Sequence, residues 1–244
     1  MDKTVFKRIE TKYLLNDIQY QALLERIRHK ARVDEYGEST ILNIYFDTPD
    51  FRLIRTSLEK PKYKEKLRLR SYGVPTEDSK VFIEIKKKYD GVVYKRRMTA
   101  SYQESLDYLY FGQGIHKKSQ ISKEVDYFLD FYHDLRPAMA ISYDRIAMIG
   151  TEDPELRITF DTNIRWRRDH LDLRYGNKGE DILLPGQHLM EIKIAGAMDL
   201  ELASILSELH IYPTSFSKYG RGYQLMMERT AREHVTYEEK IRTA

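Results

Sequence analysis

The chain has 244 residues, no cysteine and a net charge of only +3, although 32% of its residues are charged. The absence of cysteine excludes disulfides, thiolate metal sites and cysteine nucleophiles. Hydrophobic residues make up 41% of the chain, which is enough for a core, and no apolar run is long enough for a membrane-spanning helix. No linker divides the sequence. We therefore expect a cytoplasmic protein with a single domain over residues 1–244 and a flexible tail at about 235–244.

The predicted elements alternate between strands and helices along the whole chain, because stretches of two-residue periodicity are separated by stretches of helical spacing. Asn16 is a typical cap for the first helix, and Asp90-Gly91 is a typical hairpin turn. In chain order, we expect strands at 6–15, 40–47, 63–72, two in the hairpin 81–99, 137–150, 156–166 and 188–195, and helices at 16–31, 50–58, 102–111, 122–135, 197–209 and from about 215–219 to about 232.

The hairpin at 81–99 shows the strand pattern most clearly. Its first arm alternates between a charged face and a largely apolar face, and its return arm continues the charged face with Lys95 and Arg97. The same alternation recurs on the other predicted strands. The charged faces together carry Arg8, Glu10, Lys12, Lys66, Arg68, Arg70, Glu84, Lys86, Lys88, Lys95, Arg97, Tyr143, Arg145, Arg157, Asp161, Arg165, Glu191 and Lys193.

Two architectures can place such charged faces. An antiparallel sheet can bury its apolar face under helices and expose its charged face to water. However, neighbouring strands lie about 4.8 Å apart, so cations in such numbers would repel one another across an open sheet. A closed barrel lets them converge on a polyanion inside. We therefore predict an α+β fold, an eight-stranded antiparallel β-barrel with a charged lumen and helices packed outside.

A lumen rich in arginine and lysine is suited to phosphate, because arginine binds phosphate oxygens in pairs and stays protonated. The few carboxylates among these cations are candidates for a hard divalent ion, Mn²⁺ or Mg²⁺. Glu191 is the first candidate, Glu10 and Glu84 follow, and then Asp161. For each of them, an ion pair with a neighbouring cation is the alternative role.

Seven motifs in order resemble a known family, the VTC-type polyphosphate polymerase domains of the triphosphate tunnel metalloenzymes. They cover the chain from about Phe6 to about Met227, and they are FKRIETKYLL, KLRLRSYG, FIEIKKK with its KRR return arm, SYDR, LRITFDTNIR, MEIKI and SFSKYGRGY. The resemblance implies an eight-stranded tunnel barrel. It also implies transfer of the γ-phosphoryl group of ATP to a growing inorganic polyphosphate chain with a divalent metal.

The resemblance also implies roles for individual residues. Strand parity selects Lys95 rather than Arg96 as the inward-facing residue of the return arm. The expected catalytic residues are Arg68, Arg70, Lys86, Arg145, Arg157 and Lys193; the expected phosphate-binding residues are Lys12, Arg8, Lys66, Lys88, Lys95, Arg97, Arg165, Lys218, Ser217 and Tyr143; and the expected metal ligands are Glu191, Glu10 and Glu84.

One departure from the wider superfamily separates the possible activities. Hydrolytic members begin with a Glu-x-Glu-x-Lys pattern, whereas this chain has Arg8 before Glu10 and Lys12. The loss of one carboxylate agrees with a polymerase and weakens the alternative of a metal-dependent tripolyphosphatase or nucleoside triphosphatase. A non-catalytic barrel that binds polyphosphate or another polyanion is the third reading. The expected partners are ATP or another triphosphate, inorganic polyphosphate and a membrane protein, whereas nucleic acid is not expected.

Overall fold

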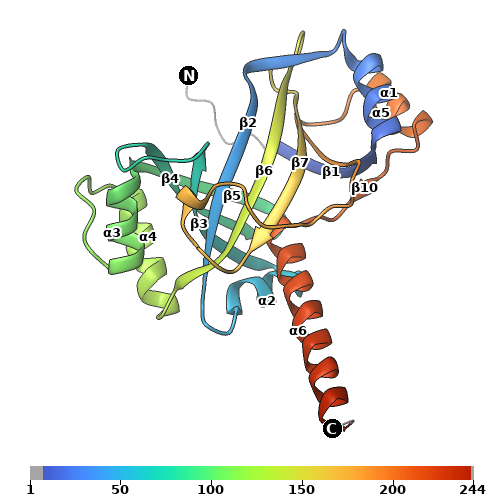
Figure 1. Cartoon of the computed structure of the whole chain (residues 1–244). Coiled ribbons are helices and arrows are strands. Elements are labelled where there is room, and N and C mark those ends of the chain that lie inside the picture. Colours follow the sequence, from blue (N-terminus) through green and yellow to red (C-terminus); the bar gives the residue numbers. More distant parts are fainter. Residues whose placement is uncertain (1–7, 243–244) are drawn as a thin grey trace.

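The computed structural model describes the backbone of residues 8–242 and the side chains of residues 9–233. These residues contain a ten-stranded antiparallel sheet with helices on its outside (Figure 1). The order of strands in the sheet is β10-β1-β9-β7-β6-β2-β3-β4-β5, and β8 pairs with β7. The long strands are β1 (Arg8–Asn16), β2 (Ala31–Asp47), β3 (Tyr63–Tyr72), β4 (Lys80–Tyr89), β5 (Val92–Ser101), β6 (Arg136–Gly150), β7 (Arg157–Arg167) and β9 (Gln187–Ala195), and the short ones are β8 (Glu180–Asp181) and β10 (Pro213–Thr214).

The helices agree closely with the sequence prediction. The Asn16 cap is confirmed, since its side chain accepts a hydrogen bond from the amide of Gln19. The helices are α1 (Asp17–Ile27), α2 (Arg52–Leu58), α3 (Tyr102–Phe111), α4 (Gln120–Tyr132), α5 (Leu200–Glu208) and α6 (Lys218–Arg242), with a short 3₁₀ helix at Leu173–Tyr175. Among residues 8–242, no helix combines the length and the apolar character that crossing a membrane requires.

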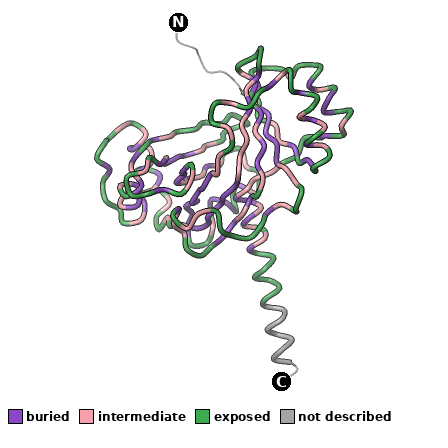
Figure 2. The backbone as a smooth tube through the Cα atoms, turned by 45° about the horizontal axis from the view of Figure 1, so that its top comes forward, coloured by how far each residue is buried: buried purple, intermediate pink, exposed green. Residues whose placement is uncertain are grey.

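The last helix differs from its prediction. Helix α6 continues to Arg242 instead of ending near residue 232, and it projects from the body of the protein (Figure 1). Figure 2 shows that its described part is exposed beyond Met226. The tail expected at about 235–244 lies outside the residues whose side chains are described.

The prediction of a closed eight-stranded barrel is wrong in one respect. The number of long strands is eight, but the backbone pairings of residues 8–242 leave the sheet open between β5 and the β1–β10 end. On the side away from β9, β1 pairs with β10 at Lys12↔Thr214 and Tyr13↔Pro213. Side chains, rather than backbone hydrogen bonds, connect β1 with the β4–β5 hairpin.

The sheet is strongly curled, because residues from distant strands meet on one face. The Oε1 atom of Glu10 on β1 lies 3.8 Å from the Nζ atom of Lys86 on β4, although β1 and β4 stand near opposite ends of the strand order. The Nζ atom of Lys66 on β3 lies 3.1 Å from the Oγ atom of Ser217, which follows β10. We call the side of the sheet on which these contacts occur the concave face.

The described residues form three apolar cores. Figure 2 shows that the buried positions follow the strands of the sheet. The outer face of β2–β5 packs against α3 and α4, and the outer face of β1, β7 and β9 packs against α1 and α5. The third core fills one end of the concave face with side chains from β2, β6, β7 and α6, including Ile141, Trp166 and Tyr219. The helices outside were predicted, whereas the apolar filling of the inside was not.

Strand β2 is longer than predicted, because residues 31–39 were assigned to the first helix or to a loop. They belong to the strand because 31–33 and 38–39 pair with β6, from Ala31↔Gly150 to Ser39↔Arg145, with a register shift between Val33 and Glu38. This partner lies more than 100 residues away in the chain, so the local sequence gives no sign of it. The extended pairing carries α1 and its core away from the third core.

A buried carboxylate joins the start of α2 to the start of α6. Asp47 is fully buried and accepts hydrogen bonds from the backbone amides of Thr48, Leu53 and Ile54 and from the hydroxyl of Tyr219. The Tyr219 ring stacks on Tyr45 with 4.6 Å between the ring centroids. Asp47 therefore anchors Tyr219, and through it holds residues 215–218 against the concave face.

Replacing Asp47 tests this connection. Asp47→Asn leaves buried amide and hydroxyl donors without a charged acceptor, so we expect the free energy of unfolding to fall by about 2–4 kcal/mol in urea denaturation. Asp50→Asn is the matched control at the exposed start of the same helix, and a loss below about 1 kcal/mol is expected there. Equal losses in the two variants would contradict the anchoring role of Asp47.

Candidate functional site

Basic side chains from six strands and from the start of α6 gather on the concave face. They come from alternate positions of their strands, which places them on the side opposite the outer cores. We call this set the basic cluster, and it consists of Lys12 (β1), Lys66, Arg68 and Arg70 (β3), Lys86 (β4), Lys95 and Arg97 (β5), Arg145 (β6), Lys193 (β9) and Lys218 (α6). The structure thus brings together most of the residues selected from the sequence.

Glu84 lies among the cations of the β3–β5 half of the basic cluster, with its side chain 1% exposed. Its Oε2 atom accepts hydrogen bonds from Arg68, with Nε at 2.8 Å and Nη2 at 2.6 Å. Its Oε1 atom accepts from Lys95 at 2.8 Å and from Arg97 at 2.5 Å. These cations occupy the acceptor positions of the carboxylate. The prediction that Glu84 binds a metal does not fit these surroundings.

Asp161 has the corresponding position in the other half of the basic cluster. Its side chain is 1% exposed, and its two oxygens accept hydrogen bonds from Nε and Nη2 of Arg145 at 2.6 and 2.7 Å. Lys218 bonds to the same carboxylate. The Tyr143 ring lies beneath both cations, and its hydroxyl accepts a 2.9 Å bond from Arg70. Tyr143 therefore connects the two halves of the basic cluster.

Residues 215–218 cross the concave face between β10 and α6. The Phe216 carbonyl accepts a hydrogen bond from Lys12 at 3.0 Å, and the Ser217 hydroxyl accepts one from Lys66 at 3.1 Å. The next residue, Lys218, adds its own charge to the basic cluster. The hydrogen bonds of Phe216 and Ser217 therefore hold the SFSKY motif against the lysines of β1 and β3.

Two carboxylates near Lys12 are the best candidates for a metal. The Lys12 Nζ atom lies 3.6 Å from Glu10 and 3.7 Å from Glu191, and Lys193 bonds to Glu191 at 2.6 Å. No group of three or more acidic or histidine side chains converges among the described residues. Mg²⁺ and Mn²⁺ fit such a site, because one or two carboxylates with substrate phosphates and water are sufficient ligands. The buried hydroxyl of Thr159, opposite Glu191 in the β7–β9 pairing, has no partner there and fits a further polar ligand.

Two predicted residues lie at the ends of the charged strands. Arg157 is exposed at the start of β7, opposite Lys193, and Lys88 is exposed near the tip of the β4–β5 hairpin, opposite Lys64. Neither side chain has a hydrogen bond or an ion pair within the described part of the chain. They extend the positive charge beyond the basic cluster but stand apart from its carboxylates.

The placement of Arg165 on the charged face is wrong. A register shift between Ser142 and Asp144 interrupts the β6–β7 pairing, and Asn163 has a positive φ of 48°. The extra residue reverses the alternation of β7, so Ile164 joins the third core and Arg165 points outward to Asp181 at 3.1 Å. Arg8 begins β1, but its side chain lies outside the described residues.

The choice of Lys95 over Arg96 is confirmed by the pairing of the hairpin. Lys95 lies opposite Lys86, and Arg97 lies opposite Glu84. Arg96 points to the outer face, where its Nε atom lies 3.4 Å from Glu124 of α4. Strand parity alone therefore fixed the inward positions here, because neither arm contains a register shift.

Two polar residues of β2 complete the site, and neither was among the residues predicted from the sequence. Asn43 accepts a 2.9 Å hydrogen bond from the Nε atom of Arg70, and the Tyr45 hydroxyl accepts one from Arg68 at 3.1 Å. The available signal was the run Asn43, Tyr45, Asp47, in which polar residues alternate with buried apolar ones.

A comparison with protein families matches residues 7–227 to the VTC domain model. The match covers most of the chain, including every strand of the concave face. This chain belongs to the VTC domain family.

Relatives of this VTC domain agree with that assignment. Subunit 4 of the vacuolar transporter chaperone complex of Trypanosoma cruzi is 25% identical over 221 residues, and the match covers 75% of this chain. It covers 28% of the relative, so the chain spans less than a third of that protein's length.

Solved structures share the fold at low identity. A candidate adenylate cyclase of Bacillus halodurans is 16% identical, with a TM-score of 0.55 over 86% of this chain and 93% of that one. A candidate adenylyl cyclase of Hippeastrum, described as having a dominant triphosphatase activity, is also 16% identical, with a TM-score of 0.55 over 89% and 95% of the two chains. The likeness supports the triphosphate tunnel fold that the motifs predicted, although the backbone pairings of the described residues leave the sheet open.

Crowding of charges shifts the pKa of several groups in the VTC domain. Burial and the neighbouring lysines lower the pKa of Lys66 to about 8. Burial also lowers the pKa of Lys95 to about 8, although Glu84 opposes the shift. Burial would raise the pKa of Tyr45, but the charges of Arg68, Lys66 and Arg70 lower it to about 8. The basic cluster without a ligand is thus close to losing protons at neutral pH.

The carboxylates of the VTC domain shift in the opposite sense. Burial alone would raise the pKa of Glu191, but Lys193 and Lys12 hold it well below its usual range. Lys218 and Arg145 likewise lower the pKa of Asp161 against the effect of its burial. Both carboxylates are therefore ionised at neutral pH, and each needs its cations to remain buried.

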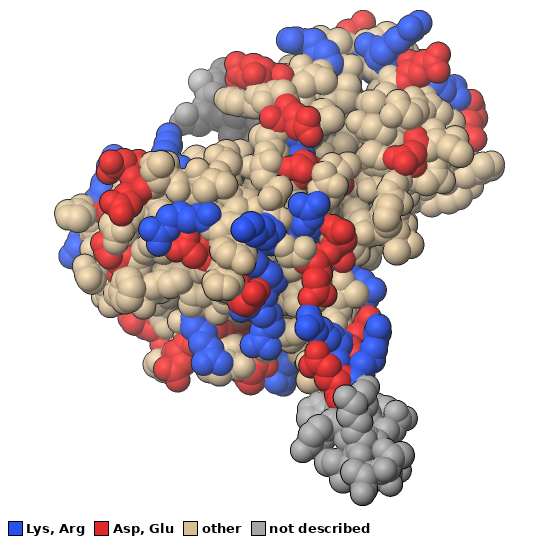
Figure 3. Space-filling view, viewed as in Figure 1, with Lys and Arg blue, Asp and Glu red and all other residues tan. Residues whose placement is uncertain are grey.

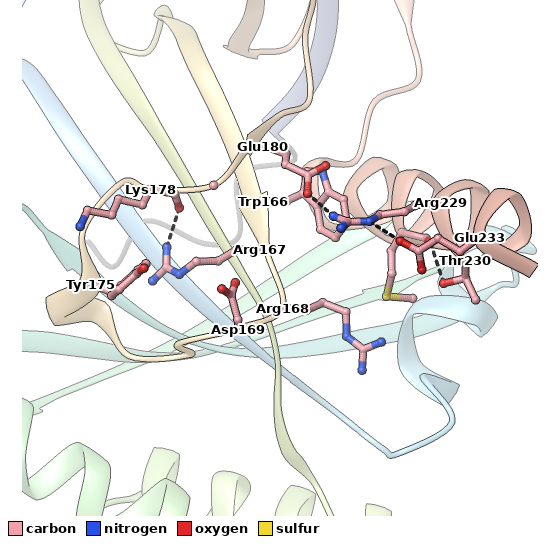
Figure 4. A pocket seen from close by; sticks show the side chains of 12 residues that line it. Trp166, Arg167, Arg168, Asp169, Tyr175, Lys178, Glu180, Arg229, Thr230 and Glu233 are labelled. Carbon is pink, nitrogen blue, oxygen red and sulfur yellow. Dashed lines mark hydrogen bonds and ion pairs between the residues drawn. The ribbon is translucent and has the colours of Figure 1, made fainter. Parts of the chain in front are cut away.

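A cavity of about 540 Å³ lies elsewhere, between the end of β7, the loop that follows it and α6 (Figure 4). Its charges are largely compensated, since Arg229 pairs with Glu180 and Glu233 while Arg167 donates to backbone carbonyls. Acidic and basic side chains are also intermixed on the face of the VTC domain that Figure 3 shows. The basic cluster is therefore the better candidate for an anionic ligand.

The lowered lysine pKa values predict proton uptake on binding. Tripolyphosphate should raise the pKa of Lys66 and Lys95, so at pH 8 binding should take up protons, and affinity should fall as pH rises above about 8. Calorimetric titration in buffers of different ionisation enthalpy measures this uptake. The double variant Lys66→Met/Lys95→Met is the reference. It lacks both lysines, so any proton uptake that it still shows comes from the ligand or from other groups. Equal uptake by both proteins would contradict the prediction.

Proposed function

We propose that this VTC domain is a metal-dependent phosphotransferase that transfers the γ-phosphoryl group of ATP to the end of an inorganic polyphosphate chain. The observation that carries the proposal is the convergence of the basic cluster on one face of a curled sheet. Like charges at this density lower stability unless an anion compensates them. A chain of linked phosphates has the required charge and length, and membership of the VTC family supports this choice.

The arginines are suited to hold phosphate oxygens in fixed positions. Glu84 and Tyr45 orient Arg68, while Asn43 and Tyr143 orient Arg70. Each guanidinium has five N–H donors, so donors remain for phosphate after these bonds are made. Arg145 and Lys218 provide a second oriented pair on Asp161. Oriented donors of this kind stabilise the charge that develops during phosphoryl transfer.

Glu191 and Glu10 are the residues proposed to hold Mn²⁺ or Mg²⁺. When bound, the metal would neutralise part of the negative charge of the phosphates. Lys193 and Lys12 keep Glu191 ionised, and Lys12 also lies 3.6 Å from Glu10, so both carboxylates stand on the concave face. The acceptor is the terminal phosphate of a polyphosphate chain, which is already anionic, so the protein needs no strong general base. Arg157 and Lys88 are proposed to guide the phosphates at the exposed ends of their strands.

The partners follow from the same assignment. The Trypanosoma cruzi relative is named as a subunit of a complex, so we propose that this domain also works beside partner subunits at the cytoplasmic side of a membrane. The substrates are ATP, or another triphosphate, and inorganic polyphosphate.

The second candidate is a metal-dependent triphosphatase, in which water replaces the phosphate acceptor. One feature favours it, because Glu10 and Glu191 lie on either side of Lys12 and can together hold a metal. Arg8 stands where the hydrolytic pattern has a further glutamate, which favours the polymerase. A binding module without turnover is the third outcome of the assay below.

Product analysis separates these activities. Purified protein with ATP and Mn²⁺ should form a ladder of polyphosphate on a stained gel, and a chelator or Glu191→Ala should abolish it. Phosphate release without a ladder would indicate the triphosphatase. Retention of polyphosphate without any turnover would make the protein a binding module and would contradict the proposed reaction.

A pair of arginine variants tests the site itself. Arg145→Ala removes an oriented donor from the concave face, and we expect a loss of about a hundredfold or more in kcat/KM. Arg165→Ala is the matched control on the neighbouring strand, where the side chain points outward to an exposed aspartate. We expect its activity to stay within about twofold of the unmodified protein. A large loss in Arg165→Ala would contradict the outward placement.

A further inference from the structure

Glu84 is the carboxylate with the most cationic neighbours in the described structure, and its contacts extend beyond the Arg68 that it orients. Three basic side chains from two strands bond to its oxygens, and a fourth, Arg70, lies 3.9 Å away. Its side chain is only 1% exposed, so water does not compensate its charge. Burying a carboxylate costs free energy unless cations and hydrogen bonds compensate its charge. Glu84 therefore depends on the cations around it, and they in turn depend on Glu84.

The geometry divides the three cations that bond to Glu84 into two kinds. Arg68 uses Nε and Nη2 on the Oε2 atom, which fixes the plane of its guanidinium. Arg97 donates its Nε to the Oε1 atom and lies 4.4 Å from the Phe82 ring centroid, so its plane is also fixed. Lys95 has no such second contact, and Glu84 is its one ion-pair partner among the described residues.

We infer that Glu84 is a positioning residue, which holds Arg68 and Arg97 in the orientation that phosphoryl transfer requires and keeps Lys95 charged. The inference rests on the proposed function, because it concerns the same site. It assigns Glu84 no contact with phosphate, whose charge would repel the carboxylate. Glu84 acts through the cations between itself and the ligand.

The charges around Lys95 explain why its protonation depends on Glu84. Arg97 on β5, Arg68 and Arg70 on β3 and Lys86 on β4 all disfavour a further positive charge. Glu84 is the group that opposes them, while Glu10 of β1 faces Lys86 and the Tyr45 hydroxyl faces Arg68. Burial lowers the pKa of Lys95 to about 8 even with Glu84 present. Without Glu84, the pKa of Lys95 should fall further, so Lys95 should lose its proton at a lower pH.

Glu84→Gln separates positioning from simple attraction. The variant has a similar shape but one negative charge fewer, so attraction alone predicts that a polyanion binds as well or better. Positioning predicts that kcat falls by about 10- to 100-fold while KM for ATP stays within about threefold. It also predicts that the decline of activity at high pH begins at a lower pH than in the unmodified protein.

Glu84→Asp and Glu124→Gln complete the experiment. Aspartate keeps the charge but is one methylene shorter, so it should keep the pH profile and recover only part of kcat. Glu124 pairs with the outward-facing Arg96 of the same hairpin, so Glu124→Gln should leave both kcat and the pH profile unchanged. Circular dichroism and melting temperature show whether each variant is folded.

Several results would overturn the inference. A folded Glu84→Gln with unchanged kcat and pH profile would show that Glu84 is dispensable. A higher KM with unchanged kcat would show that it serves ground-state binding alone, and unfolding of both Glu84 variants would show a structural role. If the unmodified protein turns over no ATP, the proposed function fails instead. The pH dependence of tripolyphosphate affinity in Glu84→Gln then decides the role of Glu84, since an unchanged profile would contradict it.

Discussion

The constraint on which this structure depends is the repulsion among basic side chains on one face of a single sheet. Lys66 faces Lys86, and Lys86 faces Lys95 across neighbouring strands, at distances where like charges lower stability. Buried Glu84 and Asp161 offset this repulsion by bonding to the flanking cations. The carboxylates are too few to neutralise the whole set. The remaining positive charge is what makes the concave face suitable for a chain of phosphates.

Neutral polar groups order the cations that form no hydrogen bond to a carboxylate. Asn43 and the Tyr143 hydroxyl accept from Arg70, and the Ser217 hydroxyl accepts from Lys66. Ser217 is held in place from outside the concave face, because Asp47 binds both the start of α2 and the Tyr219 hydroxyl. The buried polar network therefore extends from the apolar third core to the basic cluster. This continuity explains how α6 can contribute to a site otherwise built from strands.

The curled sheet is closed by side chains where its backbone is open. Glu10 and Lys86 approach each other across the gap between β1 and β4, and Lys12 bonds to the chain that follows β10. Contacts between charged side chains yield more easily than a row of backbone hydrogen bonds. An open edge between β1 and β5 is therefore compatible with access by a long polyanion, whereas a fully hydrogen-bonded barrel would admit it only through its ends.

The sequence by itself determined the family, the antiparallel strands and most of the inward-facing cations, because strand alternation has a fixed period of two and needs no partner to be recognised. Lys95 was placed correctly for that reason. Arg165 was not, since one extra residue in β7 reversed the alternation without changing its composition. The long pairing of β2 with β6 also depended on contacts between residues far apart in the chain. Only the tertiary structure could decide which carboxylates are saturated by cations, because Glu84 and Glu191 look alike in sequence and differ only in what surrounds them.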